Sequence, residues 1–137
     1  MAAHIFLATP KDLNRPAEES DSFFLEDDGY YWFLYRYFEG ANLKAREAEL
    51  IDLYGGGVIE GYQLYRLQTE LIEALRVTHL MPDRWRVLVG WESENQSKDN
   101  ERWKEVGKGE MARLIERLLR MISIASSSDL KFVSSGD

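Results

Sequence analysis

Residues 62–91 contain a helix pattern followed directly by a strand pattern, and they read YQLYRLQTELIEALRVTHLMPDRWRVLVGW. The first part of this stretch repeats apolar residues every three or four positions, which is the spacing of one helix face. The residues of this stripe are Leu64, Leu67, Leu71, Ala74, Leu75 and Thr78. Pro82 and Asp83 end the pattern, and residues 85–91 are rich in the β-branched and aromatic side chains that favour strands. We therefore predict a helix over 61–79 followed directly by a strand over 85–91.

The second half of the chain continues the same mixture of helix and strand. A polar loop over 92–101 joins the first strand to a short partner strand at 102–106. A second helix is then predicted over 109–126, because an apolar stripe again follows the helical period. Its members are Met111, Leu114, Ile115, Leu118, Ile122 and Ala125. A last strand is predicted at 130–133.

An aromatic run over residues 30–38 forms the most unusual part of the sequence. Aromatic side chains favour strands, but Asp27 or Asp28 would cap a helix and Gly40 would end one. We favour a third helix over 30–39, with a strand as the alternative.

The glycine cluster Gly55–Gly57 interrupts an alternating apolar segment. We predict a short strand at 50–54, a turn at the three glycines and a second short strand at 58–60. Towards the N-terminus, residues 5–8 form a candidate short strand, and residues 9–22 are expected to be irregular because they are polar and contain Pro10 and Pro16.

Together these elements predict an α+β fold in one globular domain over residues 1–137. Two principal amphipathic helices pack on a small, mainly antiparallel sheet, with the aromatic-rich helix as a third. The strands assigned to this sheet are 50–54, 85–91, 102–106 and 130–133.

Composition excludes several classes of function. The 24 acidic residues outnumber the 17 basic ones and give a net charge of −7, which disfavours nucleic acid as a partner. The chain has no cysteine, so disulfide scaffolds, thiolate metal sites and cysteine nucleophiles are excluded. The N-terminus does not have the pattern of a signal peptide, and no apolar stretch is long enough to cross a membrane. We expect a cytoplasmic protein with no membrane partner.

The residues offer little support for catalysis. There are two histidines: we expect His4 to lie in a frayed terminus and His79 to complement the dipole at the end of the 61–79 helix. No metal-binding motif is present, and we expect neither a metal nor a cofactor. Acidic residues are too numerous for any pair to stand out as acid and base. The sequence therefore favours a function other than catalysis.

The glycine cluster provides one alternative, a small anion- or nucleotide-binding domain or an enzyme. A strand, a glycine-rich turn and a helix can direct backbone N–H groups at a phosphate. The residues of such a site would be Gly55, Gly56 and Gly57, with Glu92 at the end of the next strand contacting a ribose. Against this, Gly61 comes one residue late for the GxGxxG pattern, and Glu60 is acidic where a phosphate needs positive charge.

The hypothesis we favour is a protein-interaction module. Residues 18–28 hold several acidic side chains and no basic one, and they lie beside Phe23, Phe24 and the aromatic run. Aromatic residues anchor protein interfaces, and surrounding charge accelerates encounter with a basic protein. The predicted interface residues are Glu26, Asp27, Asp28, Tyr30, Trp32, Tyr35 and Tyr37. Such a surface could mask a basic site on its partner, as an inhibitor or immunity-type protein does; the alternative is that the aromatic side chains simply form the core.

Self-association is a further expectation. The last predicted helix carries an excess of basic residues, opposite in sign to the acidic segment. Trp85, Trp91 and Trp103 on the predicted hairpin would add apolar area to a homodimer interface.

Overall fold

The computed structural model describes residues 2–18, 20–41, 51, 53, 55–94 and 96–136, and it confirms the α+β class. Its helices are α1 (Gly29–Ala41), α2 (Gly61–Leu80) and α3 (Lys108–Ser127). Four strands form one sheet: β1 (Ala2–Ala8), β2 (Ser22–Glu26), β3 (Gly56–Ile59) and β6 (Lys131–Gly136). A separate hairpin consists of β4 (Arg84–Trp91) and β5 (Glu101–Gly107), with a short 3-10 turn, η1 (Lys98–Asn100), between them.

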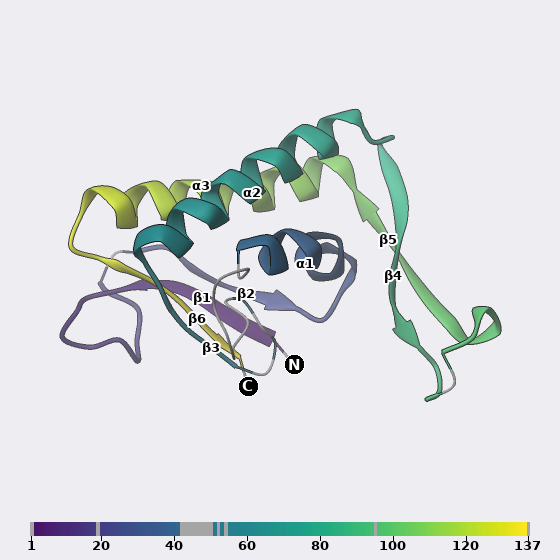
Figure 1. Cartoon of the computed structure of the whole chain (residues 1–137), viewed down its shortest axis with the longest axis horizontal. Coiled ribbons are helices and arrows are strands. Elements are labelled where there is room, and N and C mark those ends of the chain that lie inside the picture. The colour runs from purple at the N-terminus through teal and green to yellow at the C-terminus, as the bar shows by residue number, and fades with distance from the viewer. Residues whose placement is uncertain are drawn as a thin grey trace.

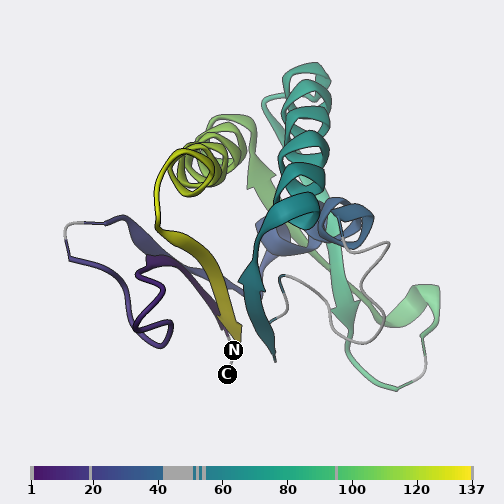
Figure 2. The ribbon, with the colours of Figure 1, turned by 60° about the vertical axis from the view of Figure 1, so that its left-hand side comes forward.

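The four-stranded sheet has the order β2-β1-β6-β3, and every neighbouring pair is antiparallel. The helices cover one face of this sheet, and the β4–β5 hairpin projects beyond it (Figure 1). Ala3 pairs with Gly136, so the two ends of the chain lie side by side in the sheet. Helix α2 packs on α1 and α3 in the helical layer (Figure 2).

The main core lies between the sheet and the helices. The alternation of β1 places Ala3, Ile5 and Leu7 in this core, together with the buried stripes of α2 and α3. Phe6 and Ala8 take the other face, where they pack with Val133 and Val58 in a smaller cluster. The sheet therefore buries apolar side chains on both faces around β1.

The predicted helices are confirmed at almost the expected residues. The periodic stripes produce α2 and α3, and the aromatic run produces α1 rather than a strand. The predicted strands at 85–91 and 102–106 also pair with each other as expected. They do not join the strand at 130–133, however, because β4 and β5 form their own two-stranded sheet against α1.

The predictions around the glycine cluster need correction. Of the strand predicted at 50–54, Ile51 and Leu53 are buried and lie outside any strand, and its other three positions are outside the described residues. Gly56 and Gly57 are not a hairpin turn. They belong to β3, whose partner is the distant strand β6 at Ser134 and Ser135.

The N-terminal region is more ordered than predicted. The candidate strand at 5–8 is part of the longer β1, which lies inside the sheet between β2 and β6. Ser22 begins β2, a strand that the sequence did not indicate. His4 therefore does not lie in a frayed terminus, because it pairs with Phe24 and Ser135 and its ring stacks on the Phe24 ring at 4.3 Å.

Candidate functional site

An acidic groove lies at the edge of the sheet, where β2 meets the first turns of α1 and α3. Its volume is about 250 Å³. Three acidic residues, Glu26, Asp28 and Glu110, line this groove together with apolar side chains. The lining residues are Phe24, Leu25, Glu26, Asp28, Tyr30, Glu110 and Leu114, and together they define what is called the acidic groove below.

Strand β2 shapes one side of the groove because it is an edge strand. Leu25 points into the main core and is buried. The pleat turns Phe24 the opposite way, and 58% of its surface is exposed. An aromatic side chain this exposed beside acidic groups is the kind of anchor that protein interfaces use.

The start of α1 shapes the next side. The Asp28 carboxylate caps this helix by accepting hydrogen bonds from the backbone N–H groups of Tyr30 and Tyr31, at 2.9 and 3.1 Å. The Tyr30 hydroxyl accepts a hydrogen bond from the Gly107 N–H at 3.1 Å, which ties α1 to the end of β5. Hydrogen bonds to the Asp28 carboxylate and to the Tyr30 hydroxyl therefore fix this wall of the groove.

The carboxylates of this region are only partly neutralised. Glu110 forms an ion pair with Arg113 at 3.6 Å, and both side chains are largely exposed. Asp27, next to the groove, accepts a hydrogen bond from the Trp32 indole N–H at 2.7 Å. Among the described residues, no basic side chain pairs with Glu26 or Asp27. The groove therefore presents negative potential around an apolar floor.

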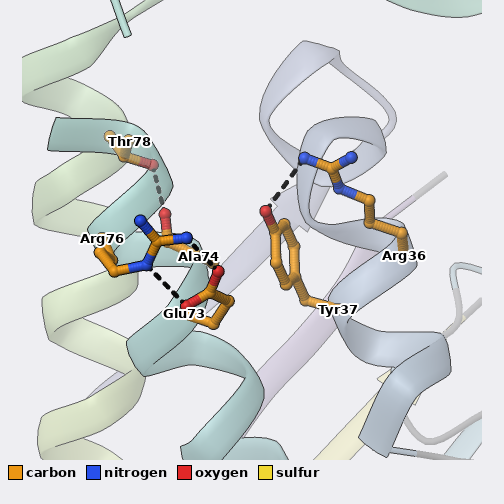
Figure 3. Close-up of polar contacts among 6 residues, drawn as sticks. All are labelled: Arg36, Tyr37, Glu73, Ala74, Arg76 and Thr78. Atoms are coloured by element: carbon orange, nitrogen blue, oxygen red, sulfur yellow. Dashed lines mark hydrogen bonds and ion pairs between the residues drawn. The ribbon is translucent and has the colours of Figure 1, made fainter. Parts of the chain in front are cut away.

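The aromatic residues of the predicted interface are divided between the groove and the core. Tyr30 lines the groove, whereas Trp32 and Tyr35 are half-buried and their rings contact each other at 5.2 Å between centroids. Tyr37 is buried, and its hydroxyl accepts a hydrogen bond from Arg36 at 3.0 Å (Figure 3). Most of the aromatic surface of residues 30–38 therefore packs inside the protein, which agrees with the alternative that these side chains form part of the core.

Glu26, Asp28 and Tyr30 are the predicted interface residues that the structure brings together in the groove. Sequence reasoning missed Glu110 and Leu114, which come from α3 and lie far away in the chain. No local pattern connects them to β2. Phe24 lies among acidic residues in the sequence, but its exposure depends on the pleat of β2, a strand that the sequence does not indicate.

The alternative glycine site divides into two separate places. Gly55, Gly56 and Gly57 line a groove of about 390 Å³ together with Leu13 and residues of β6. Glu92 is exposed at the start of the loop between β4 and β5, and it is not among the residues that line this groove. The described lining residues include no lysine, arginine or histidine.

The tryptophans expected at a dimer interface are only partly accessible. Trp85 is half-buried, with its ring at 5.3 Å from the Phe33 ring. Trp103 is 42% exposed and lies beneath the guanidinium of Arg86. Trp91 is half-buried near the hairpin loop.

Within the described residues no group of three or more histidine, aspartate or glutamate side chains is arranged to hold a metal ion. His79 lies in the last turn of α2, as predicted, and is exposed. No helix in the described part of the chain has the length and apolar character needed to span a bilayer. Comparisons with protein-family models, curated proteins and solved structures give no match.

Proposed function

We propose that the protein is an interaction module that binds a basic segment of a partner protein in the acidic groove. The observation that carries this proposal is the combination of three carboxylates with an exposed apolar surface around Phe24. By occupying a basic segment, the module masks that site on its partner, which is how an inhibitor or immunity-type protein acts. Charge steers the encounter, and the apolar floor supplies contact area.

Two further features support a basic and extended occupant. Strand β2 is the edge of the sheet, and edge strands commonly accept an added extended segment. Such a segment, carrying both basic and apolar side chains, would place its charges near Glu26, Asp28 and Glu110 and its apolar side chains against Phe24 and Leu114. The net charge of −7 attracts such a segment from a distance.

Titration with a short peptide composed of lysine and valine tests the proposal, and the binding is followed through backbone amide signals in NMR spectra. We expect signals of β2 and of the first turns of α1 and α3 to shift, and the affinity to fall as the salt concentration rises. Glu26→Lys and Glu110→Lys should each weaken binding by about tenfold. Phe24→Ala should weaken it without changing the net charge.

Glu94→Lys is the matched control, because Glu94 is exposed in the β4–β5 loop and the substitution changes the net charge equally. This variant should bind the peptide almost as the unmodified protein does. If Glu94→Lys weakens binding as much as Glu26→Lys, the peptide responds to net charge alone and the groove is not its site. The unmodified protein, Glu26→Lys and Glu94→Lys then serve as baits for cell extracts at low and high salt. A cellular partner of the groove is a protein that the Glu26→Lys bait fails to retain and the other two retain.

The groove beside Gly55–Gly57 supports a second candidate, a site for a small ligand. A Cβ atom at Gly57 would meet no atom within 4 Å, so Gly57→Glu should fold and place a carboxylate at this groove. A thermal-shift screen with nucleotides and metabolites tests the site. A compound that stabilises the unmodified protein but not Gly57→Glu would establish it; equal stabilisation of both would place the compound elsewhere.

A further inference from the structure

Helix α2 carries a second apolar face that points away from the core. Tyr62, Tyr65, Ile72 and Leu80 are exposed by 59, 62, 56 and 74% of their surface. They are four of the large exposed apolar side chains of the described residues, and they share one helix. With Thr69 and Arg76 they follow a spacing of three and four residues along the helix, and His79 lies three residues after Arg76 on the same face. These seven residues, Tyr62, Tyr65, Thr69, Ile72, Arg76, His79 and Leu80, are called the outer stripe below.

The outer stripe lies opposite the face with which α2 packs into the protein. The buried side chains of α2 are Leu64, Leu67, Leu71, Ala74 and Thr78. On one flank Arg66 donates a hydrogen bond to the Gly40 carbonyl of α1, and on the other α3 packs against the helix. Figure 2 shows α2 standing in the helical layer above the sheet. A three-and-four repeat on an exposed helical face is the pattern through which helices pair.

We propose that the outer stripe binds the outer stripe of a second copy of this chain, with the two α2 helices antiparallel. In the alignment centred between Thr69 and Ile72, each Thr69 faces Ile72 of the other copy. Tyr65 then faces Arg76 of the other copy. Arginine over a tyrosine ring is a favourable contact, so the stripe is complementary to itself.

Charge selects the antiparallel arrangement. In a parallel pair Arg76 would face Arg76 of the other copy, which is a repulsive contact. In the antiparallel pair the two arginines are separated, and each keeps its own ion pair with Glu73 at 2.5 Å on the same helix (Figure 3). Antiparallel helices also oppose their dipoles.

The contact area predicts the strength of the dimer. A 20-residue helix is about 30 Å long, and an antiparallel pair of this length buries roughly 1,000 Å² in total. This area is at the lower limit of specific interfaces, so we expect the dissociation constant of the dimer to lie between about 1 and 100 µM. The dimer should therefore form and dissociate with concentration rather than persist at every dilution.

Analytical ultracentrifugation over a concentration series tests the proposal. The unmodified protein should change from monomer to dimer, and Tyr65→Glu and Ile72→Glu should remain monomeric at every concentration. Both side chains are exposed, so circular dichroism should show that the variants fold normally. Ile124→Glu is the matched control, because Ile124 is 38% exposed on α3, outside the outer stripe. A monomer at all concentrations, or a dimer that Ile124→Glu disrupts equally, would overturn the proposal.

The absence of cysteine from the chain allows a test of the orientation. Thr69→Cys places a single thiol near the two-fold axis of the antiparallel pair, whereas Tyr62→Cys places it about 25 Å along the axis from its counterpart. Mild oxidation should crosslink the first variant and not the second. Crosslinking of both would indicate a parallel pair and overturn the antiparallel arrangement. Glu26→Lys should dimerise normally, which separates this proposal from the acidic groove.

Discussion

Gly56 occupies a backbone position that few other residues could take. Its φ of +135° lies in a region that side chains with a Cβ atom rarely adopt. A Cβ atom there would also overlap the carbonyl oxygen of Ser134, which precedes Ser135, the partner of Gly56 in the β3–β6 pair. The glycine cluster in the sequence therefore marks a close approach between strands, although the local pattern by itself favours a turn. A glycine turn and a close approach between strands can be distinguished only when the distant partner strand is known.

Gly56→Ala should destabilise the protein by about 2–4 kcal/mol, because it combines backbone strain with overlap against a fixed carbonyl. Gly57→Ala provides the control, since a Cβ atom at Gly57 meets open space and its φ is outside the left-handed region. Its unfolding free energy should change by less than about 1 kcal/mol. Urea unfolding followed by tryptophan fluorescence measures both. Equal losses in the two variants would show that the close approach at Gly56 does not limit stability.

Arg117 and Asp21 join the segment before β2 to helix α3. Arg117 donates two hydrogen bonds to the Asp21 carboxylate, at 2.8 and 2.6 Å, and a third to the Ser22 carbonyl at 3.1 Å. Its guanidinium also lies 4.3 Å from the centre of the Phe23 ring. The hydrogen bonds from Arg117 hold the pKa of Asp21 below its ordinary value of 3.8.

Because folding lowers the pKa of Asp21, this ion pair stabilises the protein above pH 3.8 and its contribution is lost as the pH falls below that value. Asp21→Asn should reduce the unfolding free energy at about pH 6 by up to about 1 kcal/mol, since the pair is partly exposed. The difference from the unmodified protein should decrease as the pH falls from 3.8 towards about 2. Asp12→Asn, which removes an exposed pair with Arg15, should matter little at either pH. A constant loss for Asp21→Asn across this range would contradict the assignment.

At the scale of elements, the sequence predicts what depends on neighbours along the chain. The stripes of α2 and α3 repeat over 20 residues each, so their period is clear. Strand β2 has only five residues, and they do not alternate between apolar and polar side chains. It forms a strand because it pairs with β1, and its own sequence does not indicate this pairing. The same applies to β3. Short strands defined by distant partners are therefore the part of this fold that local patterns could not reveal.

The beginning of α1 depends on a single capping side chain, Asp28. Asp28→Ala should lower the unfolding free energy by about 1 kcal/mol, because two N–H groups at the start of the helix lose their acceptor. Asp27→Ala removes the same charge one residue earlier, where the carboxylate contacts the Trp32 indole instead of the helix backbone. Thermal unfolding, monitored by circular dichroism, measures the stability of the Asp28→Ala and Asp27→Ala variants. A greater loss for Asp27→Ala would show that the indole contact, and not the cap, secures this end of α1.

At the scale of the whole molecule, the acidic groove is a product of topology. Residues 24–30 come from β2 and α1, whereas Glu110 and Leu114 come from α3, and only the folded chain places them together. The sequence could indicate the acidic and aromatic composition of the first part, because these residues are consecutive. It could not indicate the basic neighbour Arg113 or the apolar floor from α3. A charge pattern along the chain thus indicates the acidic character of this surface, but not the distant residues that complete it.

The topology also predicts which parts of the chain the fold can lose. Strand β6 pairs with both β1 and β3, so it connects the two halves of the sheet. The β4–β5 hairpin pairs only within itself and packs beside α1. Removing residues 129–137 should therefore abolish cooperative unfolding, because β1 loses one neighbour and β3 loses its partner in the sheet. Replacing residues 92–100 with Asn-Gly should preserve it.

The replacement is compatible with the hairpin, since Trp91 already pairs with Glu101 and Asn-Gly forms a tight turn between such strands. Shortening the loop from nine residues to two lowers the entropic cost of closing it by about 1.3 kcal/mol. Near-ultraviolet circular dichroism during heating distinguishes the two variants, because tryptophan signals report fixed packing. The hairpin variant should show one sharp transition, and the truncated chain none. A sharp transition in the truncated chain would mean that helices α1, α2 and α3 hold the core without the C-terminal strand.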